Sequence, residues 1–384
     1  MPRKLRMAMV GGGKEGFIGR FHRMAAQLTG RIELVCGAFG NTRHRSFEGG
    51  EALALPRERV YGVYRDMLRK EATLDEDGGK PDFVVITAPN NLHYPVAMAA
   101  LDAGFHVLCE KPLTTTMDEV LNLGRKLDDK QRLIGLTLSY TGYPMVRQAQ
   151  KLIREGRIGN IRRVVVECPQ GWLATRLETA GNRQASWRAD PRRVGPSGCI
   201  ADVGAHGAYL TELFTGLTIT EVSADIRSCV AGRPVEDDGA VLFRLSNGAL
   251  GVLWASQVAV GETGAIRVRV FGDKGGMSWT LDNSGELAIH APNGTSELLR
   301  SLAPTAPTEI PPPFGRVDCS CEALAYIYNQ FADGVLAFDG RRDPTPAYPS
   351  LAEGLRAVSF VDAVVRNTRP ENTEKWTRLS TGVA

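Results

Sequence analysis

A glycine-rich turn between a short apolar run and a helical pattern constrains the fold of this chain more than any other feature. The apolar run extends from Leu5 to Gly11, and apolar residues recur at helical spacing from Ile18 to Leu28. Between them, Gly11, Gly13 and Gly16 satisfy the pattern G-x-G-x-x-G. Glycines at this spacing let the backbone approach a pyrophosphate at a helix N-terminus. A tight turn that binds nothing is the alternative, because so short a pattern also arises by chance.

Apolar runs and helical patterns alternate over the first 138 residues. Further buried strands are expected at Ile32 to Phe39, Pro81 to Thr87, His106 to Cys109 and Leu133 to Leu138, with helices between them. This alternation predicts an α/β N-terminal Rossmann domain built on a doubly wound parallel sheet. We place its boundary near residue 138.

Residues 139–384 are expected to form an α+β domain. A helix from Met145 to Glu155 precedes runs that read as strands, several of them joined by hairpin turns. The runs are Arg162 to Glu167, Thr220 to Arg227, Gly239 to Leu245, Ala249 to Ser256, Ala265 to Phe271 and Gly276 to Leu281. They predict a large, mostly antiparallel sheet with an open face.

The last part of the chain is less regular. Residues 303–313 hold five prolines and should be irregular. Helices are expected at Glu322 to Leu336 and Ser350 to Val365, and these could pack back on the first domain. The polar tail after Asn367 is expected to be loosely held.

Length and composition limit the number of domains and the classes of binding partner. The 384 residues exceed the roughly 250 to 300 at which single cores stop growing, so two domains are expected. The 46 basic and 43 acidic residues nearly balance and form no dense basic run, which argues against nucleic acid or lipid and for a small-molecule partner.

The cysteine spacing and the hydropathy of the sequence predict neither a metal site nor a membrane span. The seven cysteines show no repeated C-x-x-C spacing, so they are read as reduced core thiols, and Cys319-Ser320-Cys321 is assigned no function. No metal site is expected. No run approaches the ~18 apolar residues of a membrane span, and a first strand near Leu5 leaves no room for a signal peptide. A cytoplasmic location is expected.

Two short segments carry candidate catalytic residues. Glu110-Lys111-Pro112 follows the apolar run that ends at Cys109, which places Lys111 at the carboxyl edge of the sheet. Asp202 and His206 are four residues apart, so a helix would place them on one face. Histidine, with an unperturbed pKa of ~6.5, is well suited to exchange a proton with an alcohol at neutral pH. A surface lysine and a helix surface pair are the alternatives.

Together with Trp187-Arg188-Ala189-Asp190-Pro191 and Ser197-Gly198, these segments resemble the glucose-fructose oxidoreductase/inositol dehydrogenase (Gfo/Idh/MocA) family. The resemblance runs from about residue 5 to about residue 300. Most members are nicotinamide-dependent sugar and cyclitol oxidoreductases. One departure is Cys199, where members often have a second glycine.

The resemblance implies reversible hydride transfer between nicotinamide and a secondary ring hydroxyl of a sugar, glycoside or inositol. It makes His206 the acid/base and lets Asp202 orient the substrate or tune His206. Lys111 would bond the reacting hydroxyl or the nicotinamide ribose. The same fold also hosts NAD-dependent redox-elimination glycosidases and non-catalytic dinucleotide or sugar sensors, which remain alternatives.

The resemblance also implies cofactor contacts. Gly19-Arg20-Phe21-His22 fits the family's closing Gly-x-x-His, so the turn is expected to carry an insertion that places Phe17 and Ile18 over the cofactor edge, with His22 packing on the first helix. The segment from Thr87 to His93 resembles the family turn that borders the ribose and nicotinamide. The expected cofactor-binding residues are Gly11, Gly13, Gly16, Phe17, Ile18, Asn41, Arg43, Pro89, Asn90, His93, Glu110 and Lys111.

The choice between NAD and NADP stays open. No carboxylate ends the second strand, where one would bond the ribose 2′-hydroxyl. Arg43 and Arg45 could instead meet a 2′-phosphate, or they could lie in a solvated loop.

Polar and aromatic residues of the second domain are candidates for a sugar or polyol site, although core packing explains each of them equally well. The expected substrate contacts are Tyr143, Gln170, Trp172, Arg188, Asp202 and His206. By resemblance, a homodimer or homotetramer is expected to form through the open face of the second-domain sheet, where Val241 to Trp254 alternate.

Overall fold

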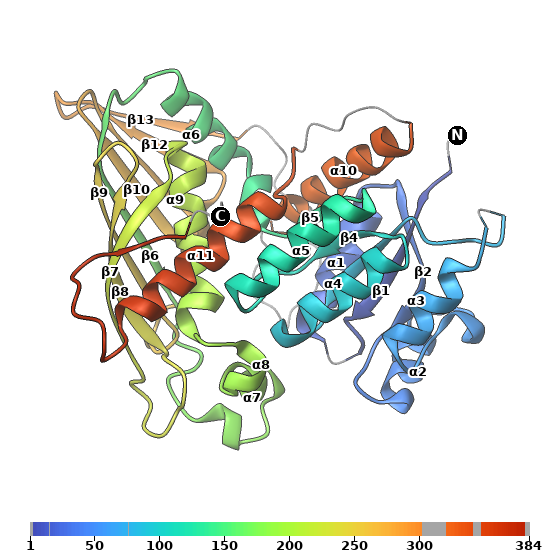
Figure 1. The fold of residues 1–384 in the computed structure, drawn as a ribbon. Helices are drawn as coiled ribbons and strands as arrows, with labels where there is room; N and C mark the ends of the chain where they lie inside the picture. Colours follow the sequence, from blue (N-terminus) through green and yellow to red (C-terminus); the bar gives the residue numbers. More distant parts are fainter. Residues whose placement is uncertain (1–2, 15, 76, 302–319, 341–346, 381–384) are drawn as a thin grey trace. The chain divides into compact units, whose positions relative to one another are not determined.

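The computed structural model describes residues 3–14, 16–75, 77–301, 320–340 and 347–380 (Figure 1). It divides into two compact units, Met1–Gly142 with Ser320–Gly354, and Tyr143–Cys319 with Leu355–Ala384. Both units are thus discontinuous in sequence, whereas the division into 1–138 and 139–384 treats each domain as one segment. The proline-rich residues 303–313 lie outside the described residues. Among the described residues, no helix has the length and apolar character that crossing a membrane requires.

The first unit is built on a five-stranded parallel sheet. Its strands are β1 (Leu5–Gly11), β2 (Ile32–Ala38), β3 (Phe83–Thr87), β4 (His106–Cys109) and β5 (Ile134–Leu136), in the order β2-β1-β3-β4-β5. Every residue of β3 is buried, as a central parallel strand covered on both faces requires. The strand order reverses between β1 and β3, and ligands of such sheets bind beyond the carboxyl ends of the strands at this point. The predicted doubly wound sheet is confirmed.

Six helices and three short 3-10 turns complete the described part of this unit. The helices are α1 (Phe17–Leu28), α2 (Arg43–Ala52), α3 (Tyr64–Ala72), α4 (His93–Asp102), α5 (Met117–Lys130) and α10 (Ser320–Asp339), and the turns are Arg57–Arg59, Asn90–Leu92 and Ser139–Gly142. A capping interaction determines where α5 starts. The Thr116 hydroxyl accepts from the Glu119 N–H, and the Glu119 carboxylate accepts from the Thr115 N–H.

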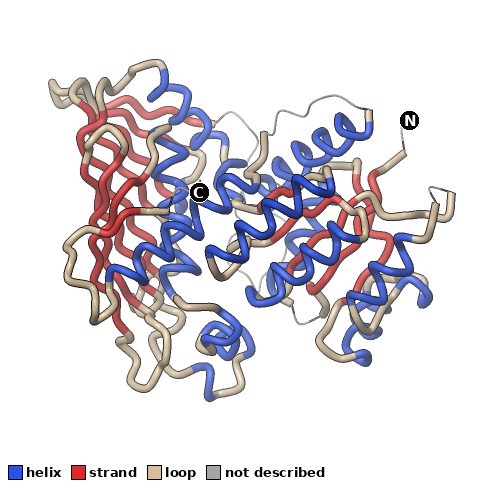
Figure 2. Tube along the Cα trace, in the orientation of Figure 1, coloured by secondary structure: helices blue, strands red, loops and turns tan. Residues whose placement is uncertain are grey.

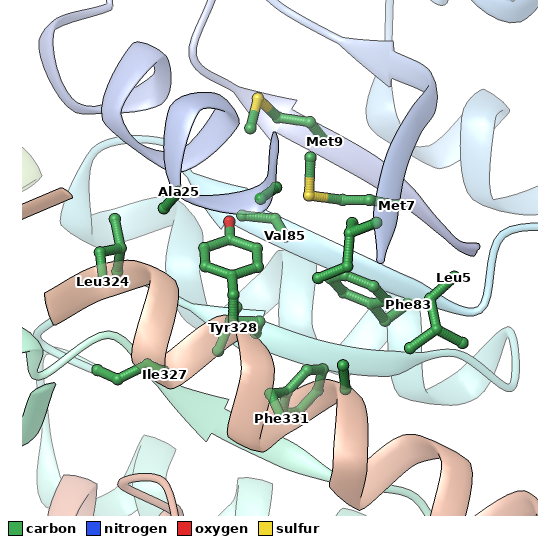
Figure 3. Packing of buried hydrophobic residues seen from close by; sticks show 14 of the residues in the cluster. Leu5, Met7, Met9, Ala25, Phe83, Val85, Leu324, Ile327, Tyr328 and Phe331 are labelled. Carbon is green, nitrogen blue, oxygen red and sulfur yellow. The ribbon is translucent and has the colours of Figure 1, made fainter. Parts of the chain in front are cut away.

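Helix α10 supplies part of the core beside the parallel sheet. Leu324, Ile327, Tyr328 and Phe331 from α10 face Leu5, Met7 and Phe83 of the strands (Figure 3). The rings of Phe331 and Phe83 meet edge to face, with centroids 5.4 Å apart. A helix from the end of the chain therefore completes the first unit.

The second unit is built on a nine-stranded sheet (Figure 2). Its strands are β6 (Ile161–Pro169), β7 (Ile219–Arg227), β8 (Asp238–Leu245), β9 (Leu250–Ser256), β10 (Arg267–Gly272), β11 (Gly276–Thr280), β12 (Glu286–His290), β13 (Ser296–Arg300) and β14 (Thr377–Arg378), in the order β13-β12-β11-β10-β6-β9-β8-β7-β14. Among the described pairs, β6 and β9 run parallel and all others antiparallel. The predicted mostly antiparallel sheet is confirmed.

The structure corrects two expectations for this unit. Strands β12 and β13 extend the sheet beyond the last strand predicted from sequence. The described part of the tail, up to residue 380, is not loosely held, because Thr377 and Arg378 of β14 pair with β7, and the Asn367 side-chain amide donates to the Thr377 hydroxyl.

Helices α6 (Pro144–Arg154) and α9 (Ala205–Thr215) pack on this sheet (Figure 1). The second unit also contains α7 (Arg183–Arg188), α8 (Pro191–Val194) and α11 (Leu351–Asn367) from Leu355 onward, with a π-helical turn at Ile200–Gly204 and 3-10 turns at Leu177–Thr179 and Leu281–Asn283. Helix α9 crosses β6, β9 and β10. It approaches closely because Gly207 has no side chain: a Cβ there would lie 2.8 Å from the Leu253 side chain and 2.9 Å from the Cys168 sulfur.

Candidate active site

The glycine-rich turn at the end of β1 is built for close backbone approach. Gly11 and Gly12 have φ angles of +90° and +68°, which favour glycine. A Cβ on Gly13 would lie 2.2 Å from the Phe39 carbonyl oxygen at the end of β2. Gly16 is the N-cap of α1 without a side-chain cap hydrogen bond, and the first turn carries no acidic residue. The N-terminus of α1 therefore fits an anion such as a pyrophosphate.

Gly19 lies inside α1, not at the end of a longer turn. The helix begins at Phe17, so Phe17 and Ile18 form its first turn instead of the expected insertion before it. A Cβ on Gly19 would lie 2.2 Å from the Gly12 Cα, which explains why a glycine is needed one helical turn after Gly16. Phe17 remains 50% exposed. Contact of Phe17 and Ile18 with a cofactor stays a prediction.

His93 braces the loops that follow β3 and β4. Its Nδ1 lies 2.6 Å from the Pro112 carbonyl oxygen and its Nε2 lies 2.8 Å from that of Ala88. The side chain is 1% exposed, and this burial lowers the pKa of His93 even though both carbonyl contacts favour the cation. Asn90, in the same loop after Pro89, is also buried. Because protein carbonyls face both ring nitrogens of His93, the structure gives it a bracing role, and a direct cofactor contact stays a prediction.

Glu110 ends β4 as a largely buried carboxylate. Its Oε1 lies 2.9 Å from His22 Nε2 and accepts from the Thr137 hydroxyl at 2.5 Å, while its Oε2 accepts from the Lys111 N–H at 3.1 Å. Burial by itself would raise the pKa of Glu110, but the His22 and Thr137 hydrogen bonds and the Lys111 charge lower it to about 2. His22 Nδ1 in turn lies 2.8 Å from the Tyr328 hydroxyl. Glu110 is therefore held ionised beside Lys111.

Basic residues open α2, directly after β2. Thr42 is the N-cap of α2 and accepts from the Arg45 N–H. Arg45 donates to the Asn41 side chain at 3.2 Å, and the Arg43 guanidinium lies 5.6 Å from the Phe47 ring centroid. Asn41, Arg43 and Arg45 are all exposed. The structure therefore keeps cations where a 2′-phosphate would lie without deciding between NAD and NADP.

In the second unit, a π-helical turn carries Asp202 and leads into α9, which carries His206. Such turns occur preferentially at functional sites. The Ser197 hydroxyl accepts from the Ala201 N–H at 3.1 Å and donates to the Glu236 carboxylate at 2.6 Å, and that carboxylate also accepts from the Ile200 N–H at 3.0 Å. Ser197 and Glu236 thus anchor the start of the segment that presents Asp202 and His206.

The segment before Asp202 accounts for two other motif positions. A Cβ on Gly198 would lie 2.5 Å from the Glu236 carbonyl oxygen, so only glycine fits there without a shift. Cys199, where family members often have glycine, is fully buried, and burial raises its thiol pKa well above the usual value. The Cys199 thiol is therefore a core group.

Asp202 is the centre of a polar cluster in the second unit. Arg188 Nε donates to Asp202 Oδ2 at 2.9 Å, and Gln257 Nε2 donates to the same oxygen at 2.8 Å. The Arg188 guanidinium lies 4.2 Å from the Trp187 ring centroid and 5.5 Å from that of Trp172. The structure therefore brings Asp202, Arg188 and Trp172 together.

Gln170 joins this cluster, because its side-chain oxygen accepts from the Trp172 indole N–H at 3.0 Å. Gln257, 2% exposed, was not predicted. Its signal in the sequence is a polar side chain directly after the buried end of β9.

Tyr143 packs its ring on Trp279. Its ring is 2% exposed and meets Trp279 edge to face, with centroids 5.7 Å apart. Tyr143 is the N-cap of α6, which Pro144 opens, so the helix start fixes the ring against the core. The structure thus places the Tyr143 ring in the core of the second unit, and a substrate contact of Tyr143 stays a prediction.

A buried ionic network, also missed from sequence, holds the loop after Trp172. Arg233 donates to the carboxylates of Glu178 and Asp237 and to the carbonyl oxygens of Leu173 and Thr175. The side chains of Arg233 and Asp237 are 2% and 1% exposed. Because the buried guanidinium is fully paired, the loop has a fixed attachment to the segment before β8.

Comparison with known sequences identifies the family. Residues 5–138 match the model of an oxidoreductase family with an NAD-binding Rossmann fold, and residues 146–278 match the GFO/IDH/MocA C-terminal domain. The chain belongs to the GFO/IDH/MocA oxidoreductase family. As a member of this family, it is an NAD-binding oxidoreductase.

Relatives of this GFO/IDH/MocA protein match over nearly its whole length. The uncharacterized oxidoreductase YfiI of Bacillus subtilis is 32% identical over 374 residues, which cover 94% of each chain. Levoglucosan dehydrogenase of Pseudarthrobacter phenanthrenivorans is 25% identical over 395 residues, covering 96% of this chain and 97% of the relative. A crystal structure of an inositol dehydrogenase homolog from Azotobacter vinelandii complexed with NAD+ is 30% identical, with a TM-score of 0.89 and 98% of each chain covered. A further structure of that homolog holds NADH and myo-inositol, with a TM-score of 0.87, 29% identity and 98% of each chain covered.

Proposed function

We propose that this protein is an NAD(P)-dependent sugar or cyclitol dehydrogenase that reversibly oxidises a secondary ring hydroxyl. The observation that carries the proposal is the Asp202 cluster. A carboxylate paired with Arg188 and Gln257 lies four residues before a histidine, among amide and indole side chains. Amides bond hydroxyls and indoles pack on the apolar faces of a sugar ring, so the cluster suits a neutral polyol. The names of the relatives, levoglucosan dehydrogenase and inositol dehydrogenase homolog, agree with this class.

The reaction assigns a role to each of three side chains. The bound nicotinamide supplies the hydride acceptor or donor. His206 takes the hydroxyl proton during oxidation and returns it during reduction. Asp202, held by Arg188 and Gln257, orients the substrate or tunes His206. Lys111, at the end of β4, stabilises charge on the reacting oxygen or bonds the nicotinamide ribose.

The first unit holds the dinucleotide in this proposal. The start of α1 takes the pyrophosphate, and the loops after β3 and β4 border the ribose and nicotinamide. The exposed Arg43 and Arg45 keep a 2′-phosphate acceptable, so NAD and NADP are both candidates. Dissociation constants for NADH and NADPH, compared between the wild type and Arg43→Ala, decide between them.

We further propose a homodimer or homotetramer that forms through the open face of the nine-stranded sheet. Leu242 of β8, 44% exposed, pairs with Val252 of β9, and Val252 pairs with Val165 of β6. Phe271, 40% exposed, lies on the neighbouring β10. A charge in this apolar strip, Leu242→Glu, should dissociate the assembly in light scattering.

The test of the activity follows the near-ultraviolet absorbance of reduced nicotinamide. The enzyme is offered NAD or NADP with a panel of inositols, aldoses and glycosides, and one substrate class should reduce the cofactor stoichiometrically. Release of reducing sugar without net cofactor reduction would contradict the proposal and favour a redox-elimination glycosidase. Dinucleotide binding with no turnover would favour a sensor.

Variants then test the assigned roles. His206→Ala and Lys111→Ala should keep dinucleotide binding and lose roughly a hundred- to ten-thousand-fold in turnover. The matched controls are His290→Ala, an exposed histidine on β12, and Lys126→Ala, a lysine paired with Asp102 on α4. Near-normal turnover of either site variant would show that its assigned role is wrong.

A further inference from the structure

A buried series of hydrogen bonds links helix α10 to the Lys111 segment. The Tyr328 hydroxyl lies 2.8 Å from His22 Nδ1, and His22 Nε2 lies 2.9 Å from Glu110 Oε1. Glu110 Oε2 accepts from the Lys111 N–H at 3.1 Å. His22 and Tyr328 are both fully buried. Neither has a part in the proposed reaction, and Tyr328 lies outside both segments that match the family models.

One assignment of protons satisfies every group in this series of hydrogen bonds. An ionised Glu110 can only accept, so the hydrogen on His22 must lie on Nε2. In a neutral imidazole Nδ1 then accepts, and the Tyr328 hydroxyl is the donor at that position. Thr137 supplies a second donor to Glu110 Oε1 at 2.5 Å. The tautomer of His22 is thereby fixed from both sides.

We propose that His22 and Tyr328 are positioning residues that act through Glu110 to hold the Lys111 segment where dinucleotide binding and turnover require it. A carboxylate buried at the end of β4 stays charged only while donors surround it. His22 supplies one donor, and Tyr328 keeps the ring of His22 oriented so that Nε2 points at Glu110. Glu110 then fixes the Lys111 backbone by a hydrogen bond from its N–H, a contact that Lys111→Ala would keep.

Helix α10 has a defined place in this arrangement. The edge of the Tyr328 ring meets the His22 ring, with centroids 5.9 Å apart, and Figure 3 shows the Tyr328 hydroxyl directed toward α1. The helix packs against α1, and Leu324, Ile327 and Tyr328 of α10 share a core cluster with Ala25 of α1. The last fifth of the chain therefore reaches the sheet edge that carries Lys111.

Other titratable groups act on the same network. They are Cys109, His93, Lys111 and Arg23. Burial raises the pKa of the Cys109 thiol well above its usual value and lowers that of His93, so both are neutral at neutral pH. Loss of the donor from His22 would consequently act mainly on Glu110, whose carboxyl would then titrate at higher pH.

The proposal is tested with NADH and NADPH binding, followed by fluorescence from about pH 5 to about pH 8. His22→Leu removes the donor to Glu110, and His22→Gln restores one from its amide. At the acid end His22→Leu should weaken binding at least about tenfold, since a hydrogen bond to a charged group is lost. The deficit should shrink as pH rises and Glu110 ionises again. In Glu110→Gln the loss of dinucleotide affinity should be the same at every pH, because the amide does not titrate.

Tyr328→Phe gives a second test that leaves the helix core intact. It should show the same pH dependence as His22→Leu with a smaller loss, about two- to tenfold. Two matched controls change buried groups outside this hydrogen-bond series: His106→Gln, at the residue whose ring accepts from the Leu133 N–H, and Tyr348→Phe, at the residue whose ring packs on Phe331. Both should bind dinucleotide as the wild type does.

Several results would overturn the proposal. They are wild-type binding by His22→Leu across the pH range, a pH-independent loss that His106→Gln reproduces, or a His22→Gln variant no better than His22→Leu. An unchanged Tyr328→Phe would remove Tyr328 from the chain of positioning residues. The turnover part of the inference rests on the proposed dehydrogenase activity, and there kcat should fall in parallel with affinity. If no alcohol supports turnover, the activity proposal fails while the binding series still decides the role of His22.

Discussion

Gly19→Ala is the smallest change that tests the architecture of the dinucleotide-binding turn. The new Cβ would lie 2.2 Å from the Gly12 Cα and 2.9 Å from the Gly12 carbonyl oxygen, both backbone atoms. Carbon atoms in contact prefer about 3.5 to 4.0 Å, so the start of α1 must move away from the turn by about 1.3 Å. No rotamer change can absorb this displacement.

The effect on stability should be small, because two contributions oppose each other. Overpacking costs about 1 to 3 kcal/mol, whereas alanine in place of a glycine inside a helix returns about 1 kcal/mol. The net loss in unfolding free energy is about 0 to 2 kcal/mol. Dinucleotide binding should suffer more, because the N–H groups of the first turn lose their alignment with the pyrophosphate. One weakened hydrogen bond to a charged group corresponds to about 1.5 to 3 kcal/mol, or roughly ten- to a hundredfold in Kd.

The assay is a fluorescence titration with reduced dinucleotide beside a urea unfolding curve. The matched control is Gly124→Ala on α5, where the nearest atom to the new Cβ is the flexible tip of Leu351 at 3.3 Å. The control should bind normally and be slightly stabilised. If Gly19→Ala bound within about twofold of the wild type, the close approach of α1 to the turn would not govern affinity.

Three further outcomes are expected. Arg188→Met should lower kcat/KM about ten- to a hundredfold by removing a charged donor from Asp202, with dinucleotide affinity unchanged, and steady-state kinetics would show this. Arg233→Met should reduce the unfolding free energy by about 3 to 5 kcal/mol, measured in urea, because the Glu178 and Asp237 carboxylates lose their buried partner. The pKa of Glu110 is lowered from 4.5 to about 2, so its contribution to stability is present above about pH 4.5 and is lost as pH falls toward about 2; Glu110→Gln should flatten the pH dependence of unfolding in that window.

The spacing of apolar residues and the position of the glycines were sufficient to predict the parallel sheet. Strand β3 reads as an unbroken apolar run because both of its faces are covered, and the glycine-rich turn marks the strand before it. Strands β12 and β13 escaped prediction because β13 is mostly exposed and its charged and apolar residues do not alternate clearly. Strand β14 has two residues, and pairing with β7 over some 150 residues of sequence is what makes it a strand.

Some site residues could be identified from local motifs, whereas others are recognised only from tertiary contacts. The positions of Asp202 and Arg188 followed from local motifs, and the structure pairs them through a hydrogen bond that no spacing revealed. Gln257 and Arg233 meet their partners only once the sheet of the second unit has formed. For Tyr143 the sequence left a sugar contact and core packing open, and the packing of its ring on Trp279 depends on tertiary contacts that no local motif reveals.

Because the first unit is discontinuous in sequence, it cannot be completed early during synthesis on the ribosome. Residues up to Gly142 leave the exit tunnel first, but helix α10, which covers Leu5, Met7 and Phe83, begins only at Ser320. At about 5 to 20 residues per second, the intervening 177 residues, 143 to 319, take roughly 10 to 35 s to synthesise. During that interval the nascent parallel sheet lacks the helix that covers Leu5, Met7 and Phe83, and exposed apolar surface of this kind is what chaperones bind. The unit whose synthesis begins first is thus completed only near the end of translation.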